Sequence, residues 1–193
     1  MKKKVIYTVI ITILILGTST LTKYEELNNL AIISNINLVY NNKKHIITLQ
    51  EIIPQKGDNK VKYEYKYTTI TASSIKKGFK KLKDYSHKKI YLKKVQNIII
   101  DYKNPKKIFA SFINYYKRNT EINKNSSLVI TKLNIEEISK IDNNYKYLSS
   151  ILKNRNVTVN DVNKIYKKKK NIKIPLLIFH NKELFFKKYI NLK

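Results

Sequence analysis

The sequence predicts an α+β domain in which helices pack against a mixed β-sheet, preceded by an N-terminal hydrophobic helix. Runs of β-branched residues alternate along the chain with segments whose apolar residues recur at helical spacing. The expected order is β-β-β-α-β-α-β-α-α-β-β, with hairpins at both ends and alternating strands and helices between them. Hydrophobic residues make up 42% of the 193 residues, which is enough for one core. We therefore expect a single domain over residues 22–193.

Three strands are expected first. Leu30–Tyr40 and His45–Pro54 are apolar and β-branched, and they flank Asn41–Lys44. Because Asn tolerates the left-handed backbone of a tight turn, these two strands should form a hairpin. Val61–Thr71 alternates Lys or Glu with Tyr, which is typical of a strand with one solvated face. It should follow the hairpin as a third strand.

Residues 72–85 are expected to form the first helix of the domain. Apolar residues recur there at helical spacing, and Ser73 or Ser74 is available as the N-cap. Gly78 either weakens this helix or allows a neighbouring group to pack closely against it.

The remaining elements follow the same two patterns. Asn97–Ile100 is an apolar run typical of a buried central strand. Pro105 opens a helix, because a missing N–H costs nothing in the first turn. Thr158 or Asn160 is available to cap the last helix. The other expected elements are a strand over Ser127–Thr131, helices over Ile135–Lys153 and Val157–Lys168, and a hairpin of Ile172–His180 and Leu184–Ile190 turned at Asn181–Lys182.

The N-terminus has the pattern of an export signal. Lys2–Lys4 precede the apolar run Val5–Gly17, and small residues follow it. Cleavage after Ser19 is one outcome, and retention of residues 1–21 as a signal anchor is the other. In both cases the positive charges stay in the cytoplasm and the remaining chain is exported. If the segment is retained, the membrane anchor includes Val5, Ile10, Ile13 and Leu16.

The chain is strongly basic, with 40 Lys and Arg residues against 13 Asp and Glu and a net charge of +27. Such a surface attracts anionic lipid headgroups, wall polymers or nucleic acid. The alternative is a solvated surface, because the lysines are spread along the whole chain. The candidate contact for an anionic partner is the run Lys167, Lys168, Lys169 and Lys170, next to Tyr166. No nucleic-acid partner is expected, since an exported protein meets little nucleic acid.

No catalytic or metal-binding pattern is present in the sequence. The histidines His45, His87 and His180 each lack a partner at metal-ligand spacing and are expected at exposed turns or strand ends. The adjacent carboxylates Glu25–Glu26 and Glu136–Glu137 point in different directions and form no acid–base pair. Because the chain has no Cys, disulfides, thiolate metal sites, Cys nucleophiles and lipid attachment through Cys are excluded. We expect no enzyme activity, no cofactor and no metal.

Just after the hydrophobic segment stands ELNNLAII, residues 26–33. Further along stand IITLQEIIP (46–54), KKIYLKKVQNIIID (88–101), IFASFINYYKRNTEI (108–122) and SLVIT (127–131). In this order and with similar gaps, these segments resemble the R-E-L-N-D-L-A-I-V opening and later motifs of Ger(x)C-type spore germination proteins, the C subunits of nutrient germinant receptors. The resemblance covers residues 24–190 and corresponds to the N-terminal domain of that family.

The chain also departs from the pattern of that family. Its members carry a lipid on a Cys shortly before E-L-N, whereas the matching position here is about Leu21. This difference favours the retained hydrophobic helix as the anchor. Lys93–Lys94 replace a Ser-His pair of the family, and Asn37 replaces a Gly, at which Asn can still accept a left-handed backbone.

The resemblance implies a non-catalytic, membrane-tethered subunit of a receptor through which a spore senses small nutrients. Polytopic A- and B-type subunits would be its partners, in the spore inner membrane, with the folded domain outside the cytoplasm. The candidate docking segment, held close to the bilayer, contains Glu26, Leu27, Asn28 and Leu30. Two alternatives stay open: a basic envelope protein that binds anionic lipid or wall polymer, and a decayed paralogue without function.

Overall fold

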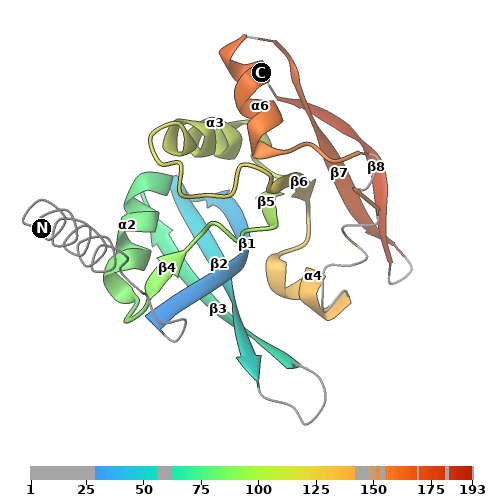
Figure 1. The fold of residues 1–193 in the computed structure, drawn as a ribbon. Helices are drawn as coiled ribbons and strands as arrows, with labels where there is room; N and C mark the ends of the chain where they lie inside the picture. Colours follow the sequence, from blue (N-terminus) through green and yellow to red (C-terminus); the bar gives the residue numbers. More distant parts are fainter. Residues whose placement is uncertain are drawn as a thin grey trace, which may run out of the picture. The chain divides into compact units, whose positions relative to one another are not determined.

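The computed structural model describes residues 29–55, 62–141, 148, 151–152, 155–168, 170–180 and 183–192. The chain divides into two compact units, Met1–Leu30 and Ala31–Lys193, and the fold described here is that of the second (Figure 1). The expected N-terminal hydrophobic helix and the expected turn at Asn181–Lys182 lie outside the described residues.

The described residues form a single eight-stranded sheet with helices packed on it, which confirms the predicted α+β class (Figure 1). The strand order is β3-β2-β1-β5-β6-β7-β8, and the short β4 pairs with β1 beside this path. The strands are β1 (Leu30–Asn41), β2 (Lys44–Gln55), β3 (Lys62–Ala72), β4 (Lys89–Tyr91), β5 (Asn97–Asp101), β6 (Ser127–Thr131), β7 (Ile172–His180) and β8 (Glu183–Leu192). The helices are α2 (Ile75–Tyr85), α3 (Pro105–Tyr116), α4 (Ile135–Ile141) and α6 (Val159–Lys167).

The centre of the sheet is parallel and its margins are antiparallel. Strands β1, β5, β6 and β7 run in the same direction, whereas β2 and β3 extend the sheet on one side and β8 on the other as antiparallel neighbours. Strand β5 lies in the middle, and its Ile98, Ile99 and Ile100 have no exposed surface. This agrees with the predicted buried central strand, since a strand covered on both faces needs a continuous apolar run.

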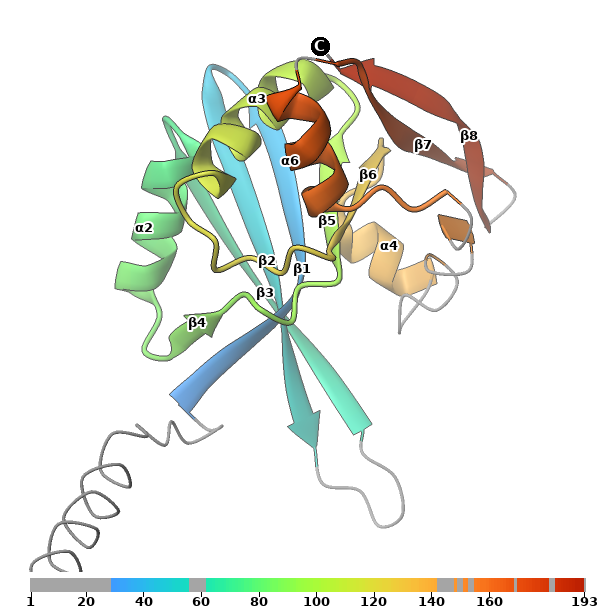
Figure 2. The ribbon, with the colours of Figure 1, turned by 45° about the horizontal axis from the view of Figure 1, so that its top comes forward.

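The two faces of the sheet carry separate cores. Ile98 and Ile100 pack with residues of α2, α3 and α6, whereas Ile99 packs with Ile135 and Ile138 of α4. Successive residues of a strand point to opposite faces, so this division places three helices on one face and α4 on the other (Figure 2).

Local sequence signals explain where the helices begin. Ser74 caps α2, with its hydroxyl accepting a hydrogen bond from the backbone N–H of Lys77. Thr158 rather than Asn160 caps α6, and it forms a reciprocal capping box with Asp161. Gly78 allows close packing of α2 on the sheet, because a Cβ there would lie 2.5 Å from Cδ1 of Ile47.

The structure differs from the predicted order in two places. Lys89–Asp101 was expected as one strand, but it contains two, β4 and β5, because residues 92–96 form a turn between them. The helix expected over Ile135–Lys153 begins as α4, which ends at Ile141, and Leu148, Ile151 and Leu152 are helical again further on. Residues 142–147 lie outside the described residues.

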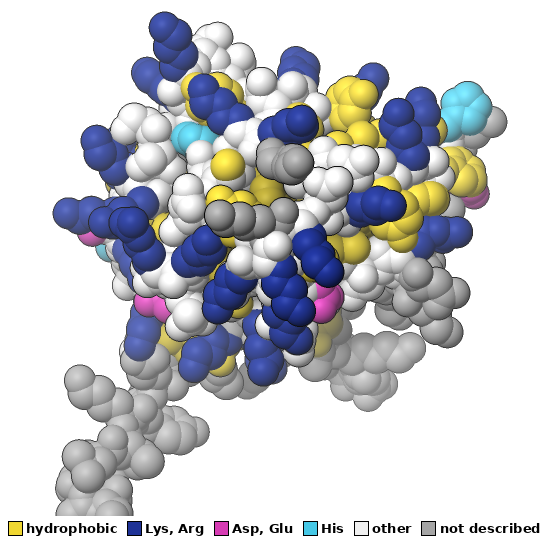
Figure 3. Space-filling view, turned by 90° about the horizontal axis from the view of Figure 1, so that it is seen from above, with side chains coloured by type: hydrophobic (Ala, Val, Ile, Leu, Met, Phe, Trp, Pro, Cys, Tyr) yellow, Lys and Arg dark blue, Asp and Glu magenta, His cyan; other side chains and the backbone are white. Residues whose placement is uncertain are grey.

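The surface is basic over the whole of the face that Figure 3 shows. Dark blue Lys and Arg side chains are scattered across this face, and only a few magenta acidic groups lie among them. The lysines therefore do not form one stripe on it, as their even spread along the sequence indicated.

The turn between β1 and β2 offers a test of backbone strain. Asn41 pairs with Lys44, so Asn42 and Lys43 form a two-residue loop, and their φ angles of 46° and 61° are left-handed. In this left-handed conformation the Cβ of Lys43 is crowded by the backbone, whereas Gly has no Cβ. Lys43→Gly should therefore raise the free energy of unfolding by about 1 kcal/mol. Urea denaturation measures this change. Lys44→Gly, in the adjacent strand position, should instead destabilise the protein, and stabilisation by both variants would contradict the assignment.

Candidate functional site

A chain of buried polar side chains crosses four neighbouring strands. The Asn97 amide of β5 donates to Asn35 of β1 at 2.8 Å, and Asn35 in turn donates to the side-chain oxygen of Gln50 on β2. Gln50 donates to the Tyr67 hydroxyl on β3 at 3.0 Å, and the Ser34 hydroxyl donates to Gln50 at 2.9 Å. Ser34, Asn35 and Gln50 are each no more than 3% exposed, so these groups depend on one another for hydrogen bonds.

This polar chain lies at an irregularity in β1. Ile33 pairs with Glu51 and Asn35 with Gln50, so Ser34 is an extra residue in the ladder. Before this bulge the odd-numbered Ile33 faces the core beneath α2 and α3, and after it the even-numbered Ile36 does. The extra residue therefore keeps apolar side chains of both halves of β1 on the same face.

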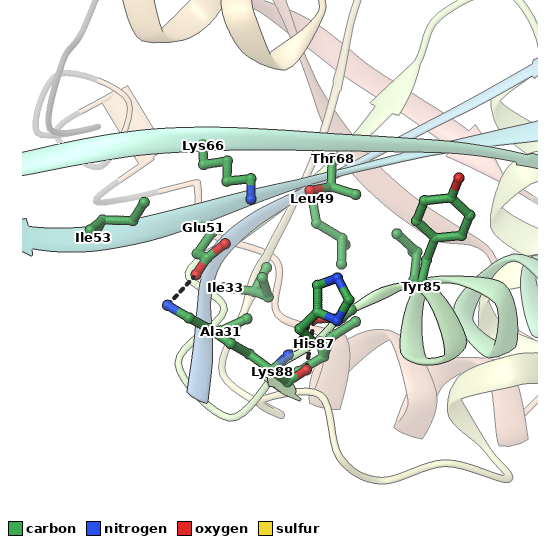
Figure 4. A pocket seen from close by; sticks show the side chains of 13 residues that line it. Ala31, Ile33, Leu49, Glu51, Ile53, Lys66, Thr68, Tyr85, His87 and Lys88 are labelled. Atoms are coloured by element: carbon green, nitrogen blue, oxygen red, sulfur yellow. Dashed lines mark hydrogen bonds and ion pairs between the residues drawn. The ribbon is translucent and has the colours of Figure 1, made fainter. Parts of the chain in front are cut away.

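The first half of β1 forms the floor of a pocket of about 420 Å³ (Figure 4). Ala31 and Ile33 contribute to this floor together with Leu49 of β2 and Leu82 of α2. These four side chains are at most 5% exposed, so the floor is apolar and shielded by the rest of the domain. The pocket is completed by β3, by the end of α2 and by the loop that follows it.

Charged groups stand at the side of this pocket. Glu51 forms an ion pair with Lys88 at 3.6 Å, and its side chain is 12% exposed compared with 45% for Lys88. Lys66 is opposite Glu51 in the register of β2 and β3, and it lines the same space (Figure 4). The Ser86 hydroxyl donates to the carbonyl of Lys88 at 2.7 Å and accepts from its N–H, which holds the loop in place.

This arrangement is suited to binding. The floor can take an apolar group, while Glu51 and the two lysines can contact polar atoms at the entrance. Within the part of the chain that the structure describes, no three His, Asp or Glu side chains are grouped as metal ligands. His87 lines the pocket and is exposed, in agreement with its prediction.

His45 differs from the prediction of an exposed histidine. It lies at the start of β2 but is only 5% exposed, and its Nδ1 has no hydrogen-bond partner. Its ring packs edge-on against that of Tyr40, with 4.9 Å between the ring centroids. Burial, and to a smaller extent the charge of Lys107, lowers the pKa of His45 below its ordinary value of 6.5. The sequence did not reveal this burial, because whether a strand end is covered depends on the helices that pack over it.

The predicted anionic contact lies at the end of α6. Lys167, Lys168 and Lys170 are exposed, and Lys169 lies outside the described residues. Tyr166 is not free to stack on a ligand, because it packs edge-on against Phe109 and the ammonium of Lys117 lies 4.0 Å from its ring centroid.

The predicted anchor residues and most of the predicted docking segment lie outside the described residues: Val5, Ile10, Ile13, Leu16, Glu26, Leu27 and Asn28. Leu30 is half-buried and begins β1. Among the helices of the described residues, none has the length and apolar character needed to cross a membrane. Asn37, expected to tolerate a left-handed backbone, is extended within β1 and does not have a positive φ.

Sequence reasoning did not single out the pocket. Its charged residues Glu51, Lys66 and Lys88 come from three separate elements, and each is unremarkable in its own segment. One available signal was Glu51 itself, the one acidic residue of β2.

The fold is that of a small α+β domain with an apolar pocket beside β1 and β2. The family model described as "Spore germination protein N-terminal domain" matches residues 23–178. The chain belongs to this family, as the ordered motifs indicated, and its role lies in germination. No curated protein and no solved structure matches it.

The polar chain predicts a large loss of stability when its central member is removed. Gln50→Leu removes the three buried hydrogen bonds that the Gln50 side chain forms with Ser34, Asn35 and Tyr67, which should lower the free energy of unfolding by about 3 kcal/mol. The matched control is Thr48→Val, two residues away on the same face, where a single 2.9 Å hydroxyl contact to Thr69 is lost. Urea denaturation should show a loss of about 1 kcal/mol for this control. Equal losses in both variants would contradict the interdependence of the network.

The pKa of His45 predicts how stability depends on pH. The unfolded chain takes up a proton on His45 at a higher pH than the folded protein does, because the pKa of folded His45 is lowered, so stability should fall as the pH falls through 6.5. The contribution of this residue is at most about 1.4 kcal/mol per pH unit. His45→Phe should flatten the dependence between pH 7 and 5, measured by urea denaturation at each pH. If the slope of stability against pH were unchanged in His45→Phe, His45 would not be a source of this pH dependence.

Proposed function

We propose that this chain is a non-catalytic, membrane-tethered subunit of a spore nutrient germinant receptor. The observation that carries the proposal is the family match over residues 23–178. Its partners would be the polytopic A- and B-type subunits in the spore inner membrane. The basic N-terminus would lie in the cytoplasm and the folded domain outside it, because long domains are translocated largely regardless of their charge. No cofactor or metal is part of this proposal.

In this proposal, the start of β1 is the contact region for the membrane subunits. The candidate docking segment from Glu26 to Leu30 runs directly into Ala31 and Ile33, which form the pocket floor. A retained anchor would limit how far this region can be from the bilayer, since each extended residue spans at most ~3.6 Å. A partner loop would place an apolar side chain on the floor and polar groups near Glu51 and Lys88.

Two adjacent residues of β2 provide a matched test. Ile52 and Ile53 are both half-buried, but they point to opposite faces, and only Ile53 lines the pocket. Membranes carrying the tagged full chain should yield the polytopic subunits in a pull-down. Ile53→Lys should reduce their recovery about ten-fold, the equivalent of roughly 1.4 kcal/mol, whereas Ile52→Lys should preserve it. Far-UV circular dichroism would verify that both variants are folded.

Two results would count against the proposal. Failure of the unchanged chain to recover any polytopic subunit would remove the receptor assignment itself. Equal recovery with Ile53→Lys and Ile52→Lys would remove the pocket from the contact region.

The high positive charge supports a second candidate function, binding of the domain to anionic lipid or wall polymer without a receptor. The net charge of +27 and the lysines scattered over the surface favour it (Figure 3). Such binding should weaken sharply as salt is added, because exposed charges are screened. Docking through an apolar floor should be much less sensitive to salt. Co-sedimentation with anionic vesicles across a salt series therefore distinguishes the two functions.

A further inference from the structure

A second pocket, of about 360 Å³, lies at the other end of the parallel strands. Its residues Tyr102 and Lys132 directly follow the carboxyl ends of β5 and β6. The first pocket instead uses Ala31 and Ile33 at the amino end of β1, which runs parallel to β5. The second pocket is thus separate from the proposed docking region. In open sheets with parallel strands, the carboxyl ends are where ligands commonly bind.

A β-bulge directs two consecutive lysines into this second pocket. Leu176 pairs with Lys188 and Leu177 with Phe186, so Lys187 is an extra residue in β8. In a regular strand Lys187 and Lys188 would point to opposite faces, but both line the pocket. Bulges are known to redirect side chains in this way, often beside binding sites.

A third lysine approaches the pocket from the loop after β6. The ammonium of Lys132 lies 5.4 Å from the ring centroid of Tyr102, within the range of a cation–π contact, and both residues line the pocket. Among the described residues that line it, none is acidic. Three lysines therefore line this space without an acidic side chain in that part of its lining.

The rest of the pocket is apolar. Leu176 is 3% exposed, Ile178 is half-buried, and Leu133 and Phe179 complete the lining. On the side of the molecule where β7 and β8 run, Figure 3 shows yellow hydrophobic side chains interleaved with dark blue basic ones. A ligand that filled this space would contact hydrocarbon on one side and ammonium groups on the other.

We propose that this pocket binds a small anion carried on an apolar body, with a phosphate or carboxylate contacting Lys132, Lys187 and Lys188. The apolar part of the ligand lies against Leu176 and Ile178. Charge-assisted hydrogen bonds supply most of the selectivity, since they are stronger than neutral ones and the apolar walls reduce competition from water. This site does not depend on the proposed receptor function, because it uses neither the anchor nor the first pocket.

Phenyl phosphate is a suitable probe because it combines both chemical features and does not form micelles. Calorimetric titration of the full chain in neutral-lipid nanodiscs should show that it binds about ten-fold more tightly than inorganic phosphate. Lys187→Gln combined with Lys188→Gln should weaken phenyl phosphate binding at least ten-fold, the equivalent of about 1.4 kcal/mol. Ile178→Thr should weaken binding of phenyl phosphate but not of inorganic phosphate, because only the former contacts the apolar wall.

The matched control is Lys76→Gln combined with Lys77→Gln. These two consecutive lysines of α2 are exposed and neither lines the pocket, so this control removes the same charge. Its phenyl phosphate affinity should change less than about two-fold, as expected for screened surface charges. An equal loss of affinity in both double variants would show a general charge effect and overturn the proposal. Equal binding of phenyl phosphate and inorganic phosphate would overturn it as well.

The source of the natural ligand is a separate arm of the same experiment. Nanodiscs containing phosphatidylglycerol should displace phenyl phosphate if the anion is a lipid headgroup, and should leave its binding unchanged if the anion is a soluble molecule. Unfolding midpoints of all variants, measured by urea denaturation, establish that they are folded. If the lysines serve only to keep the edge strand β8 from pairing with other chains, no variant will change phenyl phosphate affinity, and this result also refutes the site.

Discussion

The buried hydrogen-bond chain from Asn97 through Asn35 and Gln50 to Tyr67 is the constraint on which the rest of this domain depends. A buried amide without a partner is costly, so the four strands must keep the register that lets each group find the next. The register includes the extra residue Ser34 in β1. This bulge turns Ile33 and Ile36 to the same face, and it thereby joins the first half of β1 to the main core. Without it, the apolar floor of the first pocket would face the opposite side of the sheet.

The same device recurs at the far margin of the sheet. The extra residue in β8 brings Lys187 and Lys188 to one face, as the extra residue in β1 does for two apolar side chains. The two pockets consequently have different chemistry although both are partly apolar. One has a nearly buried carboxylate, Glu51, beside lysines, and the other has lysines alone. The two pockets therefore differ in charge, and they lie at opposite ends of the parallel strands.

Most of the fold was predictable because its elements are encoded locally. The apolar run of β5, the serine cap of α2 and the proline at the start of α3 each act within a few residues. The sites were not predictable in the same way. Glu51 and Lys88 come from separate elements and meet only because α2 and its following loop fold back over β2. The run Lys167–Lys170, which is conspicuous in the sequence, instead lies at a helix end beside a Tyr166 ring that is already occupied by Phe109 and Lys117.

The sequence by itself determined the α+β class, nearly all of the strands and helices, the strong positive charge and the membership of the spore germination family. Periodicity, capping residues and ordered motifs are local properties, so they can be recognised without knowing which strands pair. Only the tertiary structure decided the burial of His45, the two bulges and the residues that line the two pockets. These features depend on contacts between segments far apart in the chain. If one strand shifted its register by one residue, its side chains would move to the opposite face of the sheet, and the bulges and the pocket linings would both change.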